Sequence, residues 1–449
     1  MWTPFRKDND LLDAIARLWI RPVAAGYLPP PYRADLAGGR LVALSKFPKP
    51  GIRPICITDA WRRLAAKGLG TTSDAQFQAF FQESQTNALQ FGGNTRNGAT
   101  NMFHLLSSVA DSVTDGQRDS DDPRRDPLVI LALDSANAFN TLSRAQLTAV
   151  LQQGCAHFVN HPRDPLSPGP AQPAGWDILW RHIQAHYGCK GHLRFFHDGK
   201  VSFISSETGV QQGDPLGSTL FALALHPVLT ELGRHHQVLI TAYADNVVIS
   251  GPLSRVFGAQ EALRQSMIDI GLHLNPTESE LYIPEWSDVP SDQVADLMSL
   301  SSCSFCQGEN GESFRMLNGD LIPWRRPGLK ILGCPLGSAQ FCTDLLQRTV
   351  SKIEADLAVL STFPPLHQRI KLAVFCSNTQ ASYFLRAAKL PFQPRSCMVW
   401  MRLLTPSWQP PSIFPTILPA TWTGPGTPVP SNKSALASNR VVMGSQAPL

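Results

Sequence analysis

Two aspartates lie where the chain can bring acidic side chains together. Asp134 ends a short apolar run, Pro127–Asp134, which predicts a strand buried on both faces. Asp245 lies within Val238–Ser250, two β-rich runs separated by an Ala-Asp-Asn segment that suits a hairpin turn. An acid at the end of a buried strand is costly unless a metal or hydrogen bonds receive it. On neighbouring strands the two carboxylates could lie side by side, as Mg²⁺ requires when it also binds substrate phosphates.

Helices are predicted around these strands. A capping box of Ser143 and Gln146 predicts a helix that continues through Gln153. The segment Leu216–Leu232 is apolar on most sides and predicts a buried helix disturbed at Pro227. A further amphipathic helix is predicted from Ser254, with Gly271 as its stop. The order is strand, helix, buried helix, hairpin and helix.

Three segments rich in Pro, Gly and Asp are predicted to be loops or insertions: Asp111–Pro127, Asn160–Gly175 and roughly Trp286–Pro327. The stretch Thr405–Leu449 contains nine prolines, no acid and no apolar periodicity. We therefore expect this C-terminal tail to be disordered.

Composition narrows the class of protein. With 449 residues and 43% hydrophobic residues, the chain can fill a core, which excludes wholesale disorder. The net charge of +4 is too small for a histone-like polycation. Basic residues nevertheless concentrate in two stretches, 40–67 and 345–395. These stretches predict two basic surfaces and suggest a phosphate-rich partner.

The cellular setting follows from cysteines and hydropathy. Nine scattered cysteines indicate reduced thiols, and the first ten residues lack the apolar core of a signal peptide. The longest apolar stretch, Leu220–Leu229, is interrupted by His226 and Pro227 and is too short to cross a bilayer. We expect a soluble intracellular protein, in the nucleus or the cytoplasm, that does not engage a membrane.

Six segments in order resemble the successive motifs of reverse transcriptases, and most closely those of non-LTR retrotransposons. The resemblance covers roughly residues 35–345. The segments are LVALSKFPKPGIRPI (Leu41–Ile55), LALDSANAF (Leu131–Phe139), GVQQGDPLGSTLFAL (Gly209–Leu223), AYADNVV (Ala242–Val248), GLHLNPTESEL (Gly271–Leu281) and LKILGCPLG (Leu329–Gly337).

This resemblance implies an α+β, right-hand polymerase fold with fingers, an antiparallel-sheet palm and a partial helical thumb. The implied divisions are fingers at 1–127 and 145–205, palm at 128–144 and 206–344, partial thumb at 345–400 and a disordered tail at 401–449. The implied activity is RNA-directed DNA synthesis on an RNA template and a DNA primer. Deoxynucleoside triphosphates would be the substrates, and two Mg²⁺ ions, or Mn²⁺, the cofactors.

The resemblance also implies roles for individual residues. Asp134 and Asp245 match the metal-binding aspartates, and Asn246 follows in the catalytic hairpin. Phe139 matches the aromatic residue that excludes a ribose 2′-hydroxyl. Residues matched to contacts with the incoming nucleotide are Lys46 (or Lys49), Arg53, Gln212 and Gly213. Leu332 and Gly333 match the hairpin that positions the primer end.

Two positions depart from the family pattern. Asn246 replaces the usual second aspartate, so the aspartates supply one negative charge fewer to the cations. Glu278 stands where the family often has a lysine, a candidate general acid for the leaving pyrophosphate. We therefore expect reduced activity. A catalytically inactive relic that only binds nucleic acid is the alternative, and an RNA replicase a third. The chain also reads like a fragment of a mobile element.

Simpler interpretations exist for these residues. Asp134 and Asp245 could serve only a turn and a hairpin, Phe139 could be core, and the Lys46–Arg53 loop could be a solvated basic loop. A second group of residues has spacings that zinc could use: His182, His186, Cys189 and His192. We favour ordinary structural roles for that group, and a loop with two thiols for Cys303 and Cys306.

Overall fold

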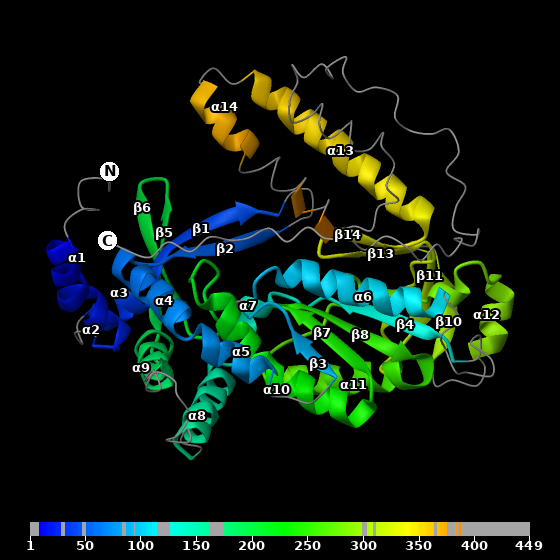
Figure 1. The fold of residues 1–449 in the computed structure, drawn as a ribbon, viewed down its shortest axis with the longest axis horizontal. Helices are drawn as coiled ribbons and strands as arrows, with labels where there is room; N and C mark the ends of the chain where they lie inside the picture. The colour runs from blue at the N-terminus through cyan, green and yellow to red at the C-terminus, as the bar shows by residue number, and fades with distance from the viewer. Residues whose placement is uncertain are drawn as a thin grey trace, which may run out of the picture. The chain divides into compact units, whose positions relative to one another are not determined.

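The computed structural model describes residues 9–27, 32–46, 51–82, 87–93, 95–114, 126–160, 175–298, 303–308, 311–362, 366–374, 382–383 and 386–387. Within these ranges helices and sheets are mixed, so the predicted α+β class is confirmed (Figure 1). The predicted disordered tail, 401–449, lies outside the described residues. The subdomain boundaries given above stay predictions.

A five-stranded sheet, here called the palm sheet, forms the centre of the fold (Figure 1). Its strand order is β3-β7-β8-β4-β9, antiparallel except for the parallel pair β3 and β7. The predicted buried strand and the predicted hairpin are both confirmed as its central members. The strands are β3 (Ala88–Gln90), β4 (Leu128–Leu133), β7 (Leu239–Tyr243), β8 (Asn246–Pro252) and β9 (Glu280–Tyr282).

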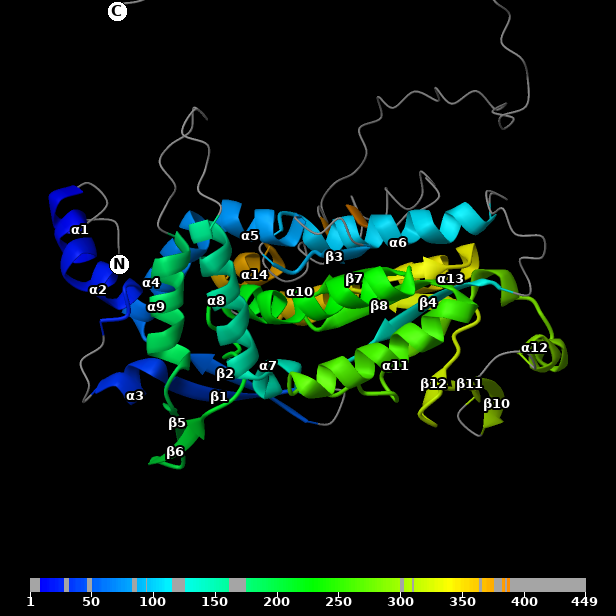
Figure 2. The same cartoon turned by 90° about the horizontal axis from the view of Figure 1, so that it is seen from below.

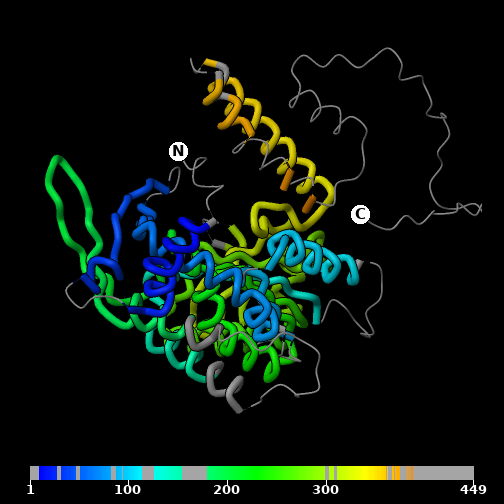
Figure 3. The backbone as a smooth tube through the Cα atoms, turned by 60° about the vertical axis from the view of Figure 1, so that its left-hand side comes forward, coloured from blue at the N-terminus to red at the C-terminus, as the bar shows by residue number. Residues whose placement is uncertain are grey.

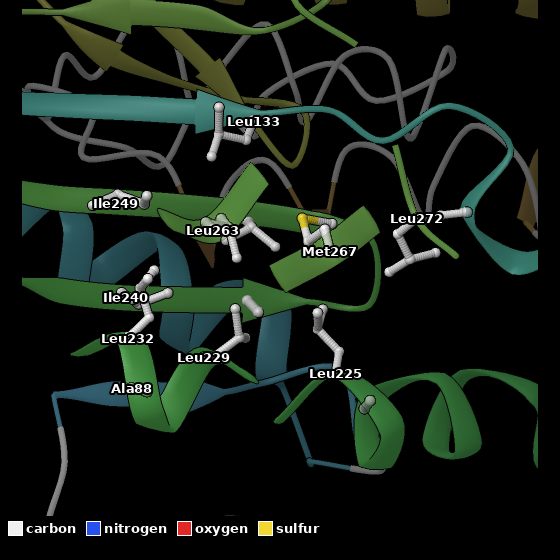
Figure 4. Packing of buried hydrophobic residues seen from close by; sticks show 14 of the residues in the cluster. Ala88, Leu133, Leu225, Leu229, Leu232, Ile240, Ile249, Leu263, Met267 and Leu272 are labelled. Atoms are coloured by element: carbon white, nitrogen blue, oxygen red, sulfur yellow. The ribbon is translucent and has the colours of Figure 1, made fainter. Parts of the chain in front are cut away.

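Alternate residues of β4 enter two separate hydrophobic clusters. Val129, Leu131 and Leu133 join the cluster formed with α10 (Gly217–His236) and α11 (Leu253–Asp269), part of which Figure 4 shows. Leu128 and Ile130 join the cluster formed with α6 (Gly98–Thr114). Because side chains alternate between the faces of a strand, helices cover the palm sheet on both sides, as Figure 2 shows. This burial explains why β4 is a continuous apolar run.

The helix predictions agree with the structure. The capping-box helix is α8 (Arg144–Asn160), and the Ser143 hydroxyl accepts a hydrogen bond from the Gln146 amide. The predicted buried helix is α10, which includes Pro227. The helix predicted from Ser254 is α11, and Gly271 follows it at φ +79°.

A second sheet, here called the fingers sheet, has the order β2-β1-β5-β6. Its strands are β1 (Gly39–Ser45), β2 (Ile52–Ile57), β5 (Gly191–His197) and β6 (Lys200–Ser206). Helices of the same region are α1 (Asn9–Ile15), the π-helix η2 (Ala16–Ile20), α2 (Arg21–Ala24), α3 (Arg33–Ala37), α4 (Ala60–Thr72), α5 (Asp74–Gln82) and α9 (Gly175–Tyr187).

The segment from 286 to 327 is not the loop that its composition predicted. It holds α12 (Ser291–Met298) and a three-stranded antiparallel sheet of β10 (Ser304–Gly308), β11 (Gly311–Arg315) and β12 (Leu321–Pro323). Of the two predicted alternatives, a loop or an insertion, the loop is wrong, because turn residues between such short strands dominate the composition. Cys306 accordingly lies in β10, while Cys303 is buried just before it. The loop predicted from Asp111 is also wrong at its start, because α6 continues to Thr114; residues 115–125 and 161–174 are outside the described ranges.

Two hairpin strands and two helices follow. These are β13 (Gly328–Ile331), β14 (Cys334–Gly337), α13 (Ala339–Ser361) and α14 (Leu366–Leu372). Leu332 and Gly333 form the turn between β13 and β14, both at positive φ. None of the helices in the described ranges combines the length and the apolar character needed to cross a membrane.

Candidate active site

A cavity of about 330 Å³ opens where β4 ends and the β7–β8 hairpin turns. Leu133 pairs with Val247, so Asp134 and the hairpin tip emerge at the same edge of the palm sheet. The volume lies in the range of small-molecule binding sites. The cavity brings together seven residues singled out from the sequence: Lys46, Arg53, Asp134, Phe139, Gln212, Asp245 and Glu278.

Backbone hydrogen bonds fix the position of Asp134. Its amide donates to the Ser279 hydroxyl (3.2 Å), and its carbonyl accepts from the Asn275 amide (2.8 Å). Ser279 is itself buried and donates to the Asn275 carbonyl (2.8 Å). The backbone of this residue is therefore held by the segment that leads into β9, a contact that could not be foreseen from the sequence.

Asp245 occupies a two-residue turn, since Tyr243 pairs with Asn246. The preceding residue, Ala244, has φ 54°, a left-handed conformation that costs free energy for a residue other than glycine. Gly92 packs against this turn so closely that a Cβ there would lie 2.2 Å from the Ala244 nitrogen. The tip of the hairpin is therefore clamped from a neighbouring loop.

Burial and a neighbouring cation act in opposite directions on the pKa of Asp245. Burial raises the pKa of its carboxyl group, because water is excluded from the charged form. The positive charge of Arg53, on β2, opposes this shift only in part. A bound cation would favour the ionised form further.

Asn246 is exposed as the first residue of β8 and is not among the residues that line the cavity. Its amide donates weakly to Asp245 Oδ1 (3.4 Å) and to the Tyr243 carbonyl (3.5 Å). In this arrangement the side chain orients Asp245 from outside the cavity.

Phe139 is fixed by stacking and by its short helix. It lies on α7 (Ala138–Thr141), which follows Asn137 at φ 51°. Its ring stacks on Phe221 of α10, with ring centroids 4.9 Å apart and planes at 17°. One side of Phe139 therefore packs on the core, while the residue also lines the cavity. Phe139 therefore contacts the core, as the simpler interpretation predicts, and also lines the cavity, as contact with a substrate would require.

Gln212 and Gly213 extend the edge of the fingers sheet. The Cys56 amide donates to the Gln212 carbonyl (2.7 Å), which ties this turn to β2. Gly213 has φ +108°, and a Cβ there would lie 2.5 Å from the Cys56 carbonyl oxygen, so only glycine fits. Gln212 lines the cavity, whereas Gly213 shapes the turn that presents it.

The two cationic residues of the cavity come from the fingers sheet. Lys46 follows β1, and its amide donates to the Gly51 carbonyl (3.0 Å); Arg53 lies on β2. Lys49, the alternative to Lys46, lies outside the described residues. Glu278 lines the cavity from a turn before β9, so the predicted departure lies beside the aspartates.

A buried polar network supports the Gln212 turn and was missed by sequence reasoning. Asp214 accepts from Arg62 Nη2 (2.6 Å) and from the Tyr187 hydroxyl (2.8 Å). Arg62 also donates to the Ala37 carbonyl (2.7 Å), which Gln211 Nε2 shares (2.8 Å). The side chains of Arg62 and Asp214 are 0% and 1% exposed. Arg62 therefore does not belong to the predicted basic surface of residues 40–67.

The charge of Asp214 depends on its partners. Burial acts to raise its pKa, but Arg62, the Leu216 amide and the Tyr187 hydroxyl outweigh burial, so the pKa lies below its usual value. No signal in the sequence distinguishes such a buried pair from two solvated charges, because the partners are 152 residues apart.

The residues with zinc-like spacing lie in different settings. His182 and His186 are buried on α9, whereas His192 is on β5 beside Asp35 (3.2 Å). Within the described ranges, no group of three or more His, Cys, Asp or Glu side chains is arranged to hold a metal ion. The carboxylates that line the cavity belong to Asp134, Asp245 and Glu278.

Comparison with known proteins gives one sequence relative. No protein-family model matches the chain. It is 28% identical over 152 residues to the retrotransposable element SLACS 132 kDa protein of Trypanosoma brucei gambiense. The match covers 33% of this chain and 11% of that protein, so the chain corresponds to a small part of the relative. The match supports a retrotransposon relationship; the narrower non-LTR assignment stays a prediction.

Solved structures that this chain resembles weakly include a telomerase and an RNA-dependent RNA polymerase. Telomerase from Candida albicans, in complex with a telomeric RNA fragment, has a TM-score of 0.41 at 12% identity; the match covers 88% of this chain and 61% of that chain. The BmCPV RNA-dependent RNA polymerase, at its elongation state, has a TM-score of 0.37 at 12% identity, with 60% and 22% covered.

Proposed function

We propose that the chain is the RNA-directed DNA polymerase region of a retroelement, which extends a DNA primer on an RNA template. The observation that carries the proposal is the shared cavity. Two aspartates from neighbouring strands, two cationic residues from the fingers sheet and an aromatic ring all line it. The sequence relationship to a retrotransposon-encoded protein supports the same conclusion.

Asp134 and Asp245 are the residues that would hold two Mg²⁺ ions, or Mn²⁺ in their place. Both line the cavity, and the partly buried carboxyl of Asp245 would gain from a cation because burial disfavours its charge. Cations bound there would lower the pKa of the primer hydroxyl and offset the charge of the leaving pyrophosphate. The hydrogen bonds to the backbone of Asp134 and the close contact of Gly92 with the hairpin tip would hold the two backbone segments that carry these carboxylates.

The remaining residues would select and orient the nucleotide. Arg53 and Lys46 would contact the triphosphate, as a bidentate donor and a point charge respectively. The ring of Phe139, fixed on Phe221, would leave no room for a 2′-hydroxyl and so favour deoxynucleotides. The Gln212 turn would contact the base or sugar of the incoming nucleotide.

A catalytically inactive relic is the second candidate, and Asn246 and Glu278 favour it. Asn246 brings no charge, and Glu278 places a carboxylate in the cavity where a triphosphate would lie. Both changes would weaken metal and nucleotide binding. An active enzyme with reduced turnover and an inactive relic would share this site. Only a measurement of activity distinguishes them.

Primer extension separates the two candidates. Purified protein is given a DNA primer on poly(rA) with dTTP and Mg²⁺ or Mn²⁺. We expect the natural chain to extend the primer, and Asp134→Asn to lower the rate of extension by at least about a hundredfold. Asp292→Asn on α12 is the matched control and should have no effect. If the natural chain is inactive and Asn246→Asp with Glu278→Lys restores extension, the relic is correct. If neither chain extends a primer, the polymerase proposal fails.

A further inference from the structure

The turn between β13 and β14 has a backbone conformation that its first residue does not favour. Ile331 pairs with Cys334, so Leu332 and Gly333 form a two-residue hairpin turn. Their φ angles are 48° and 90°. Glycine and asparagine adopt positive φ readily at these positions, whereas leucine does so at a cost in free energy. The turn therefore needs contacts from elsewhere in the chain that offset this cost.

One such contact comes from Tyr383, which lies 51 residues further along the chain than Leu332. The Tyr383 hydroxyl donates a hydrogen bond to the Leu332 carbonyl (2.8 Å). A Cβ atom on Gly333 would lie 3.8 Å from Cε1 of the same ring, so the ring also adjoins the second residue of the turn. In Figures 1 and 3 the short orange pieces of this segment lie near the yellow β13–β14 hairpin.

The segment that carries Tyr383 is also held by α6. Nε2 of His104, on α6, donates to the Arg386 carbonyl (3.0 Å). Ala387 is fully buried and belongs to the hydrophobic cluster that α6 forms with β13 and β14. The position of Tyr383 is therefore set by a helix of the main fold as well as by the hairpin that it contacts.

Tyr383 also lies beside the hairpin that carries Asp245. Tyr243 ends β7 two residues before Asp245, and it packs against the same hydrophobic cluster as Tyr383 and Leu332. Burial raises the pKa of the Tyr383 hydroxyl, and the neighbouring Cys334 and Tyr243 raise this pKa further. One side chain therefore bonds to the β13–β14 turn and adjoins the strand that leads to the aspartate.

We propose that Tyr383 is a positioning residue, which fixes the β13–β14 turn relative to Asp245 and so directs a primer 3′ end into the cavity. The inference rests on the proposed function, and within it on the Leu332–Gly333 turn as a contact for the primer end. Loss of the hydroxyl would free the Leu332 carbonyl and let the turn relax. A displacement of about 1 Å can slow a reaction about a hundredfold. Tyr383 would act only through the turn, because it does not line the cavity.

Hydrogen exchange followed by mass spectrometry tests the contact without any need for activity. Tyr383→Phe removes the hydroxyl and keeps the ring. We expect the peptide that covers residues 330–336 to exchange about fivefold faster, as the loss of one partly buried hydrogen bond predicts. Tyr282→Phe is the matched control, a buried tyrosine of the same cluster whose hydroxyl bonds with Ser287. It should leave the exchange of this peptide as it is.

A primer–template with 2-aminopurine at the primer 3′ end reports on the position of that end. It is bound in Ca²⁺ without nucleotides, so the measurement does not depend on extension. We expect Tyr383→Phe to change the fluorescence of the bound primer end and leave the affinity unchanged, because phosphate contacts dominate binding. Leu332→Asn, which gives the turn the favoured Asn-Gly pair, should restore both the exchange and the fluorescence in the Tyr383→Phe background. Tyr282→Phe should match the natural chain.

Extension kinetics give a third measurement. Tyr383→Phe should lower kcat about tenfold with the KM for dTTP unchanged. Extension of a primer with a mismatched 3′ end should fall less than extension of a matched primer, so discrimination between the two narrows. A loss of folded protein alone would lower both rates by the same factor and leave their ratio as it is.

Each contrary result has a definite meaning. Unchanged exchange in Tyr383→Phe would overturn the proposal, and so would faster exchange with unchanged fluorescence, which would leave the residue a structural role only. The same changes in Tyr282→Phe would also overturn it. Natural protein that holds the primer end through Tyr383 but does not extend it would refute the polymerase activity alone. Natural protein that does not bind the primer–template would refute both proposals.

Discussion

The interior under the palm sheet is apolar, whereas the interior between α4 and α9, at the base of the fingers, also contains buried charged and polar side chains. Under the palm sheet, Val129, Leu131 and Ile249 pack on apolar helices, and the stability of this cluster depends on how closely its side chains fill the space. Between α4 and α9 the fully buried groups include Arg62, Asp214 and His182. Besides apolar side chains such as Leu69 and Leu179, that region contains directed hydrogen bonds, which stabilise only when each partner is present.

The difference separates two tasks. The apolar interior supports the two strands that carry the aspartates, and any well-packed core of equal volume would do so. The polar interior fixes the turn that presents Gln212, because Asp214, two residues later, bonds to groups on α4 and α9. We infer that the first region tolerates exchange of side chains of equal volume, whereas the second depends on each hydrogen-bonded partner.

Removing Arg62 should have the largest effect. Arg62→Met leaves Asp214 buried and charged without its partner, which we expect to lower the free energy of unfolding by about 3–5 kcal/mol. Denaturant unfolding measures the change, with Lys67→Met, exposed on the same helix, as the control. The double variant Arg62→Met with Asp214→Leu should lose less than the sum of the two single changes. Additive losses would show that the pair does not act as a unit.

A leucine comparison sharpens the contrast between the two sheets. Leu131→Ala removes a fully buried side chain from β4 and should cost about 2–5 kcal/mol. Leu44→Ala makes the same chemical change on β1, where the side chain is 50% exposed, and should stay within about 0.5 kcal/mol. Thermal unfolding of both variants gives the comparison. Equal losses would mean that the fingers sheet is as deeply packed as the palm.

Most of the palm could be predicted, because its buried strands and helices have continuous or periodic apolar residues in the sequence. β4, the hairpin, α8, α10 and α11 all follow from periodicity and turn chemistry. The fingers sheet could not be derived in the same way, since β6 is exposed along most of its length and shows no buried face. The Arg62–Asp214 pair was equally inaccessible, because polar contacts between distant residues leave no periodic signal. The site residues could be grouped through their resemblance to known motifs. The close contact of Gly92 with the hairpin turn, in contrast, has no signal in the sequence and is seen only in the structure.

Acid should lower the stability of the region between α4 and α9, where His182 is buried. Burial, with the nearby charge of Arg62, lowers the pKa of His182 to about 4. The unfolded chain therefore takes up a proton below about pH 6.5 while the folded chain does not, so stability falls as the pH drops. This residue alone should remove about 2 kcal/mol between pH 7 and pH 5. Unfolding of His182→Leu should lack that part of the loss, although His186 also contributes, because its pKa is lowered by burial too.

An exposed histidine provides the control. His197→Gln is the matched variant, because it replaces a histidine whose side chain is 74% exposed. If His182→Leu retains the full slope between pH 7 and pH 5, the histidine is not shielded from water as the structure indicates.

The three-stranded sheet of β10, β11 and β12 has its own means of support. Arg326 binds Glu312 through two nitrogens, donates to the Val289 carbonyl and lies over the Trp324 ring at 4.0 Å. In this sheet the turn at Asn318 and Gly319 is exposed, and hydrogen bonds between Asn318 and Asp320 close it. An affinity tag or fluorescent probe inserted at that turn should therefore report on the protein without disturbing the strands that carry the aspartates.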